Sequence, residues 1–258
     1  DLFIQDIPPA SKVGIEVTQP EIYYGELTDR FVLVGTKAKE FDFPNGDENA
    51  YTTYSGDGGV PVGTTLRQAL FSLYYQSFDI LLSNYITPES KIMFRRQVKE
   101  RVSTLAPFLH MDRDPYLVVV DGRMKWMMDA YTTTDRYPYA EPFLLPRKSI
   151  NYIRNSVKVV MDAYHGTVDF YVSDSSDPMI QVYSRIFPGA FKAMEALPES
   201  LVSHIRYPAD FFDVQAAMYR AYHMTDPTVF YNKEDMWESP KELFGDKEQL
   251  MQSYYLIM

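Results

Sequence analysis

The stretch that decides the fold is Tyr-Leu-Val-Val-Val-Asp-Gly-Arg-Met-Lys-Trp-Met-Met-Asp-Ala-Tyr, residues 116–131. Its first half alternates, with Tyr116, Val118 and Val120 at every second position. Asp121-Gly122 follows, a dipeptide typical of tight β-turns. Beyond the turn the alternation resumes from Met124 to Ala130. Because side chains along a strand alternate between faces, the stretch predicts a β-hairpin.

A second hairpin is predicted downstream. Residues 157–163 alternate up to His165-Gly166, and residues 168–172 alternate on the return. The two hairpins together predict a four-stranded antiparallel sheet over residues 115–175, with one face buried. Between them, residues 132–149 contain three prolines and are expected to form a loop.

Helices are expected on both sides of the sheet in the sequence. A helix from Thr64 or Thr65 to about Leu82 is apolar almost all round, so we expect it to be central. Thr87-Pro88-Glu89 has the residues of a helix start, which gives a helical pair over 64–106. The basic residues that follow are expected on one face of this second helix: Lys91, Arg95, Arg96, Lys99 and Arg101.

After the sheet, residues 177–258 are expected to be helical. Asp177-Pro178 and Tyr207-Pro208 begin two helices, and Thr225-Asp226-Pro227 ends the second. The apolar stripe expected on that second helix comprises Phe211, Val214, Met218 and Tyr222. Residues 1–60 are expected to form an outer layer of strands and loops, and residues 45–63 a long surface loop. The fold class is therefore α+β, in one module spanning 1–258.

Composition limits the class of protein. The net charge of −10 disfavours binding to nucleic acid and to anionic lipid, which need a positive surface. No cysteine is present, so disulfides and zinc–thiolate sites are excluded in this chain. No stretch of about 20 apolar residues predicts a membrane span. The start at Asp1 and the apolar ending at residues 254–258 lead us to expect a piece of a longer protein.

Few motifs indicate chemistry. The glycine-rich stretch 56–63 lacks the Lys-Ser/Thr pair of a phosphate-binding loop and is interpreted as an ordinary loop. Asp112-Arg113-Asp114 is interpreted as a turn with an internal ion pair. The four histidines lack the spacing of a helical metal site: His110, His165, His204 and His223. We expect neither a metal nor a cofactor.

One segment stands out as a candidate binding surface. Residues 134–139 combine ions, aromatic rings and proline between the two hairpins, and residues 151–155 follow closely. Tyrosine and arginine anchor interfaces and stack on ligands. The alternative is a loop pinned onto the sheet by its own side chains. The candidate ligand-binding residues are Asp135, Arg136, Tyr137, Tyr139, Tyr152, Arg154 and Asn155.

The same segments resemble a known family. The resemblance is carried by residues 119–123, 129–139, 151–158, 222–227 and 229–232. It extends over the whole chain, and the family is uncharacterised protein family 0182, of large bacterial membrane proteins. The resemblance implies a location on the extracytoplasmic face of the cell membrane, with the protein's own transmembrane region as a neighbour. It implies no reaction. Residues 161–168 also resemble the hairpin of PepSY domains.

Three functions remain open. The first is a non-catalytic extracytoplasmic module that binds a protein or a cell-envelope ligand, or acts as a scaffold. The second is an envelope hydrolase that uses pairs among Asp112, Asp114, Asp135 and Asp174. The third is a domain stabilised by calcium. Convergence of two of those carboxylates in a closed pocket would favour the hydrolase.

Overall fold

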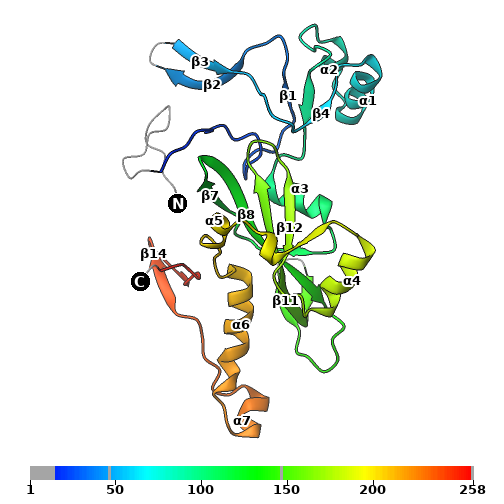
Figure 1. The fold of residues 1–258 in the computed structure, drawn as a ribbon. Coiled ribbons are helices and arrows are strands. Elements are labelled where there is room, and N and C mark those ends of the chain that lie inside the picture. Colours follow the sequence, from blue (N-terminus) through cyan, green and yellow to red (C-terminus); the bar gives the residue numbers. More distant parts are fainter. Residues whose placement is uncertain (1–14, 46–47, 146–147, 257–258) are drawn as a thin grey trace.

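A central, mainly antiparallel sheet organises the chain. The computed structural model describes residues 15–45, 48–145 and 148–256 (Figure 1). The main sheet has six strands in the order β13-β12-β11-β8-β6, and β7 also pairs with β8. These strands are β6 (His110–Met111), β7 (Tyr116–Val120), β8 (Arg123–Thr134), β11 (Tyr152–Asp162), β12 (Val168–Val172) and β13 (Phe191–Ala193). The α+β fold class is confirmed.

Both predicted hairpins are confirmed. Strands β7 and β8 pair with Val120 opposite Arg123, so the loop between them is Asp121-Gly122 alone. Both loop residues have positive φ, 52° and 72°, which is the geometry of a two-residue type I′ turn. Strands β11 and β12 pair from Val157–Val172 to Met161–Val168. The β8–β11 ladder joins the two hairpins, with an irregularity between Arg154 and Val157.

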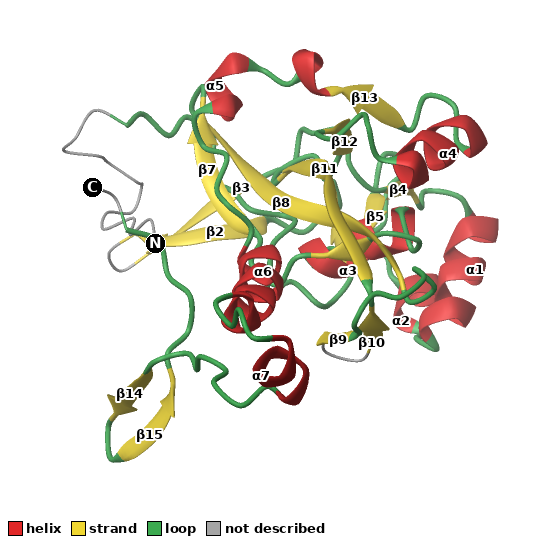
Figure 2. Cartoon of the chain, turned by 90° about the horizontal axis from the view of Figure 1, so that it is seen from below, coloured by secondary structure: helices red, strands yellow, loops and turns green. Residues whose placement is uncertain are grey.

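The prediction that one face of the sheet is buried was wrong, because both faces are covered. On one face Met128, Ala130 and Val159 pack with Val102 of helix α3 (Val98–Leu105) and with Ile180 of helix α4 (Pro178–Ile186). On the other face Met127 and Val160 pack with Leu197, which precedes α5 (Glu199–Val202), and with Leu201. Figure 2 shows the helices distributed around the strands.

The predicted helical pair is broken up. Helix α1 (Thr65–Tyr75) ends at Gln76 in a left-handed conformation, and the short α2 (Asp79–Leu82) follows. Thr87-Pro88-Glu89 forms a turn, in which the Thr87 N–H donates to the Ser90 hydroxyl at 2.8 Å. Strand β5 (Lys91–Met93) then pairs with two N-terminal strands. The expected basic helical face does not exist, because only Lys99 and Arg101 lie on α3.

The expectation that the first helix is central was also wrong. Leu66 and Leu73 are 71% and 78% exposed. Only its inner side packs, on a small core of Val62, Ile80 and Ile92. The helix therefore lies at the surface of a small lobe.

The outer layer expected at the N-terminus is present among the described residues. Strands β1 (Val32–Val34), β5 and β4 (Val60–Pro61) form one small sheet. Strands β2 (Glu40–Asn45) and β3 (Glu48–Thr52) form a hairpin. The stretch expected as a loop over 45–63 therefore contains two strands. The first 14 residues lie outside the described part.

The C-terminal region is helical only in part. Asp177 caps α4, as its Asp-Pro pair predicts. Asp226 caps α7 (Pro227–Asn232), so the Thr225-Asp226-Pro227 stretch, predicted only to end the preceding helix, also begins a new one. A 3-10 turn, η1 (Met194–Ala196), follows β13, and helix α6 (Ala209–Tyr222) lies between α5 and α7. A hairpin of β14 (Lys241–Phe244) and β15 (Lys247–Leu250) replaces the expected helix near the end. On the expected stripe of α6, Val214 is buried but Met218 and Tyr222 are exposed.

The second hairpin turn offers a test of this packing. Gly166 has a φ of +70°, and a Cβ there would come within 3.0 Å of the buried Tyr24 ring. We expect Gly166→Ala to lower the free energy of unfolding by about 2–3 kcal/mol, through overpacking as well as backbone strain. Gly189→Ala is the control, since Gly189 has a φ of +82° with nothing within 4 Å. If urea unfolding showed an equal loss of unfolding free energy in the two variants, overpacking against Tyr24 would not be the cause.

Candidate functional site

The candidate loop is held to the sheet by one side chain. The Oδ1 atom of Asn151 accepts from the Tyr137 N–H at 2.9 Å, and its Nδ2 donates to the Tyr137 carbonyl at 2.8 Å. The chain turns between β8 and the short hairpin of β9 (Phe143–Leu145) and β10 (Lys148–Ile150). Residues 135–142 therefore form a loop with a fixed anchor.

Three tyrosines project from this region. The rings of Tyr137 and Tyr152 stack, with centroids 5.6 Å apart and planes at 21°. Tyr152 is fixed further, because its hydroxyl donates to Asp177 at 2.8 Å. Tyr139 has a φ of +59° and a fully exposed side chain. Since a bulky residue rarely adopts positive φ, this conformation holds an aromatic ring in solvent at some cost.

These tyrosines form one wall of a groove of about 650 Å³. The opposite wall comes from α6 and α7, which contribute aliphatic, methionine and aromatic side chains. We call this site the aromatic groove; its lining includes Tyr137, Tyr139, Phe143, Tyr152, Val214, Ala217, Met218, Ala221, Tyr222, Phe230 and Met236. The groove is thus a mostly apolar channel between the loop and a helix.

The structure brings together only part of the predicted site. Tyr137, Tyr139 and Tyr152 line the groove, whereas Asp135, Arg136, Arg154 and Asn155 do not. Asp135 and Arg136 form an exposed ion pair at 3.9 Å. Arg154 donates to Asp174 at 2.9 Å. Hydrogen bonds from Ser176 and Arg154 lower the pKa of Asp174. Asp135, Arg136 and Arg154 thus form local ion pairs, and the role of all four residues as ligand contacts stays a prediction.

Sequence reasoning missed the second wall of the groove. The missed residues lie on α6, on α7 and just after α7, more than 60 positions from the loop. Met218 and Tyr222 fall on the apolar stripe that the sequence assigned to the core. Two cations also line the wall, but each has a partner: Lys233 pairs with Glu141, and Arg220 donates to the Trp237 carbonyl. No signal in the sequence connects these helices with the loop.

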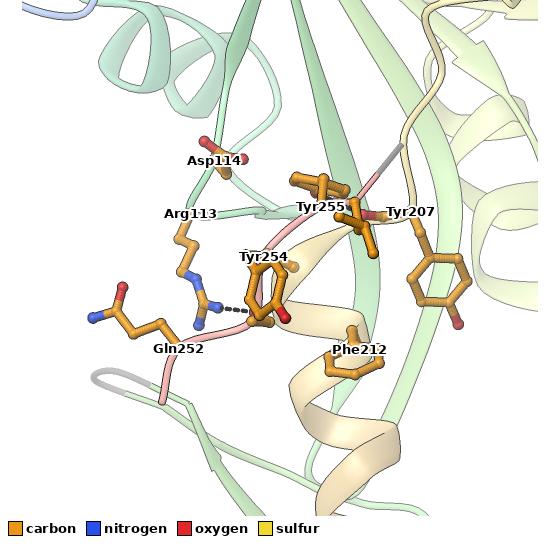
Figure 3. A pocket seen from close by; sticks show the side chains of 10 residues that line it. Arg113, Asp114, Tyr207, Phe212, Gln252, Tyr254 and Tyr255 are labelled. Atoms are coloured by element: carbon orange, nitrogen blue, oxygen red, sulfur yellow. Dashed lines mark hydrogen bonds between the residues drawn. The ribbon is translucent and has the colours of Figure 1, made fainter. Parts of the chain in front are cut away.

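A second cavity of about 630 Å³ lies where the C-terminal segment crosses the start of α6 (Figure 3). Arg113 donates to the Ser253 hydroxyl at 2.9 Å, and Tyr255 donates to the Tyr207 carbonyl at 2.7 Å. The cavity is lined in part by Asp114, Phe212 and Tyr254 (Figure 3). The polar groups named here serve mainly to hold the C-terminal segment.

The trio Asp112-Arg113-Asp114, of which the last two residues line this cavity, differs from expectation. Arg113 does not pair with its sequence neighbours; its guanidinium lies 3.3 Å from Asp210 and also binds Asp213. Asp112 is buried and accepts from the Tyr131 hydroxyl and from the N–H groups of Asp114 and Asp210. The predicted internal ion pair was therefore wrong. The trio instead fastens the first turn of α6 to the sheet.

The structure does not assemble the acid pair of the hydrolase hypothesis. Asp112 is buried, Asp135 is exposed, and Asp174 is held by Arg154. Besides Asp114, whose N–H donates to Asp112, the acids close to Asp112 are ones the sequence did not suggest, Asp129 and Asp210. Burial raises the pKa of both, against the opposing charges of Lys158 and Arg113. Across residues 15–45, 48–145 and 148–256, no group of three His, Asp or Glu side chains is placed to hold a metal ion. No set of candidate ligands in these residues therefore supports the calcium hypothesis.

Comparison with known proteins gives a consistent relationship. The model of the family described as "Uncharacterised protein family (UPF0182)" matches residues 1–258. A UPF0182 protein of Pelotomaculum thermopropionicum is 51% identical over 99% of this chain and 28% of its own length. One of Geobacter sp. strain M21 is 54% identical over the whole chain and 28% of its own length. One of Trichodesmium erythraeum is 48% identical, with 30% of its length covered. No solved structure matches the chain.

The chain therefore spans less than a third of the length of these relatives. Within the part of the chain that the structure describes, no helix has both the length and the hydropathy required to cross a bilayer.

Proposed function

The chain belongs to the uncharacterised protein family UPF0182, and from that premise we propose that it is a non-catalytic binding or scaffolding module. In this proposal the aromatic groove receives a partner on the extracytoplasmic face of the bacterial membrane. The location is supported by the resemblance of the chain to extracytoplasmic regions of large membrane proteins. The chain covers 28% of the length of the Pelotomaculum thermopropionicum relative, so the proposal concerns this module and not the whole protein.

The groove is the single observation that carries the proposal. Its rings are prearranged, because Tyr137 stacks on Tyr152 and Asn151 fixes the loop backbone. Rigid aromatic side chains give much contact area for a small loss of conformational entropy, and they are enriched at binding hot spots. An ordered apolar channel of this size suits recognition without the need for a reacting group.

The chemistry of the walls narrows the partner. Tyrosine faces stack on apolar side chains and on sugar rings alike, and the groove's two cations already have partners. The partner is accordingly an uncharged or weakly charged segment: a stretch of protein, including the protein's own membrane region, or a ligand of the cell envelope. Nucleic acid is disfavoured by the net charge of −10.

Site-directed labelling tests both the groove and its location. A full-length protein with all other cysteines removed would carry Tyr139→Cys, and intact cells would be treated with a membrane-impermeant maleimide. We expect slow labelling because the partner covers the groove. Adding Tyr137→Ala should accelerate labelling about tenfold or more, since loss of an anchoring ring costs more than ~1 kcal/mol of binding free energy.

Tyr51→Cys provides the control, because Tyr51 lies on β3 outside the groove and is 53% exposed. Its labelling should be fast and indifferent to Tyr137→Ala. Fast labelling of both positions regardless of Tyr137 would remove the groove as a binding site. Labelling of neither in intact cells, but of both after lysis, would remove the proposed location.

A further inference from the structure

Helix α6 ends at a histidine whose ring nitrogens are buried without partners. Nδ1 and Nε2 of His223 are both shielded from solvent, and neither has a hydrogen-bond partner among the described residues. A neutral imidazole carries one donor and one acceptor, so burial in that form leaves both unsatisfied. Buried polar groups are almost always hydrogen-bonded, and an exception of this kind requires an explanation.

The ring packs against two residues of the segment that follows α7. Its plane stacks on Trp237, with centroids 4.1 Å apart and planes at 7°. Its Nε2 atom lies 3.5 Å from Oδ2 of Asp235, and this contact is an ion pair only when the imidazole is protonated. A charge-assisted hydrogen bond between such groups is shorter, about 2.8 Å. Since the Asp235 side chain is 80% exposed, it has room to approach the ring.

The same segment closes a flap that forms part of the aromatic groove. The Trp237 N–H donates to the Arg220 carbonyl at 3.2 Å, and the Arg220 guanidinium donates to the Trp237 carbonyl. These bonds return the chain to α6 after it has passed through α7, which lies beyond the end of α6 (Figure 1). We call residues 224–237 the flap; its groove-lining residues are Phe230, Lys233 and Met236. Contacts that fasten Trp237 therefore fix part of the second wall of the groove.

Asp235 is the acid that the structure places against the ring. Other charged side chains are close in the sequence, but four of them bond elsewhere: Arg220 to the Trp237 carbonyl, Asp226 to the first turn of α7, Lys233 to Glu141, and Glu234 to Asn232. Glu238 follows Trp237 and is exposed. Arg220 opposes a positive charge on His223, whereas Asp235 favours one.

We propose that His223 and Asp235 form a proton-dependent clasp that fastens the flap to α6. Proton uptake by His223 turns its unpaired acceptor into a second donor, and the Asp235 carboxylate then closes onto Nε2. The imidazolium also stacks favourably on the face of the Trp237 indole. Histidine is the side chain that ordinarily exchanges its proton between about pH 5 and 8, so the clasp closes in mild acid and loosens as the pH rises.

The clasp gives the aromatic groove a means of regulation. A fastened flap holds Phe230 and Met236 in place, and a prearranged wall loses less conformational entropy when a partner binds. This consequence rests on the proposed binding function, whereas the clasp itself does not. His223 is thus a positioning residue, which acts on the groove through Trp237 and the flap.

Fluorine NMR of the purified chain, labelled with 5-fluorotryptophan, tests the clasp. The chain has two tryptophans, Trp126 and Trp237, so the variant Trp237→Phe assigns both signals. We expect the Trp237 signal to follow a one-proton transition between about pH 5 and 8. Trp126 is the internal reference, because its buried indole donates to the Tyr24 carbonyl at 2.9 Å in the core and should not follow this transition.

Three variants identify the groups involved. His223→Phe should abolish the Trp237 transition while it keeps a ring against the indole. Asp235→Asn should move the midpoint to lower pH, with a proton affinity about twofold to fivefold weaker, as for a partly exposed ion pair. Glu234→Gln is the matched control, since it removes the same charge one residue away, where the carboxylate accepts from Asn232 at 2.9 Å. Its midpoint should move far less.

Three outcomes would overturn the clasp: a Trp237 signal that stays constant over this pH range, a transition that survives His223→Phe, or equal shifts in Asp235→Asn and Glu234→Gln. If His223→Phe does not fold by circular dichroism, the comparison of the two exposed acids decides alone.

The labelling experiment at Tyr139 keeps the two proposals distinct. Fast labelling of Tyr139→Cys in cells, together with the expected Trp237 transition, would remove the binding function and leave the clasp. Slow labelling together with a constant Trp237 signal would remove the clasp and leave the binding function.

Discussion

Asp177→Ala is expected to lower the free energy of unfolding by about 3–5 kcal/mol. The Asp177 carboxylate is fully buried and joins three elements of the fold. It accepts from Thr132 of β8 at 2.5 Å, from Ser156 of β11 at 2.6 Å, and from the Met179 N–H in α4 at 3.1 Å. Its removal would leave two buried hydroxyl groups without their acceptor and take the cap from α4. Urea unfolding measures the loss.

The loss of stability caused by Asp177→Ala should depend on pH in a defined direction. Burial acts to raise the pKa of Asp177, but the hydrogen bonds from Ser156, Thr132 and Tyr152 outweigh it, so the pKa lies below its ordinary value of 3.8. The stability that an acid of lowered pKa contributes is present above its unfolded pKa and lost as the pH falls through the folded one. The difference in free energy of unfolding between the parent and Asp177→Ala should therefore become smaller only in strong acid.

A matched control exists on the same chain. Asp226 also precedes a proline and caps α7 through Thr228 and Val229, but it is exposed. Asp226→Ala should cost only about 1 kcal/mol, the usual value of a helix cap. A similar loss in both variants would show that capping alone, and not the buried network, accounts for the role of Asp177.

Lys158→Met is expected to cost about 3–5 kcal/mol, since it would leave a buried carboxylate without its cation. Lys158 and Asp129 are directly opposite one another on β11 and β8, and their side chains form an ion pair. Both residues are at least 90% buried. Burial already raises the pKa of Asp129 against the opposing effect of Lys158, so loss of the lysine should raise it further.

The sign of the pH dependence follows from that shift. An acid with a raised pKa binds its proton more tightly in the folded state, so stability falls as the pH rises from its ordinary pKa of 3.8 through the folded value. The difference in free energy of unfolding between the parent and Lys158→Met should be largest at neutral pH and should become smaller in acid. Adding Asp129→Leu should restore most of the stability, because an apolar pair can replace a buried ion pair.

An exposed cross-strand pair provides the comparison. Lys192 of β13 lies 2.7 Å from Asp169 of β12, and both side chains are more than 40% exposed. Lys192→Met should cost less than about 1 kcal/mol, because solvent screens the pair. Failure of the Asp129→Leu substitution to rescue Lys158→Met would mean that the ion pair itself, and not the burial of a lone charge, governs this site.

Local sequence patterns were sufficient to predict structure that depends on residues close together in the sequence. Asp121-Gly122 between alternating strands allows only a short hairpin, since both residues must adopt positive φ. The Asp177-Pro178 pair likewise predicted the start of α4, whereas Asp226-Pro227, predicted only to end a helix, also begins α7. Thr87-Pro88-Glu89 has the same kind of residues and failed, because the Ser90 hydroxyl bonds the Thr87 N–H and the Gly35 carbonyl instead.

The sequence likewise predicted one part of the candidate site and missed the other. Its loop was found from composition alone, because tyrosine, arginine and proline gather within a few positions. Its second wall was missed, because α6 and α7 approach the loop only after the sheet and its helices have packed. The prediction of one buried face would leave the other face of the sheet in solvent, but packing on that second face buries Asp129 and Lys158.

By itself, the sequence determined the two hairpins, the capped helix starts and the α+β class, because turn geometry and side-chain alternation depend on residues a few positions apart. The tertiary structure alone decided that both faces of the sheet are covered, that α1 turns an apolar side outward, and which distant helix completes the groove. Those outcomes depend on which apolar surfaces meet, and an apolar side chain carries the same local signal whether it meets the core, a partner or a membrane.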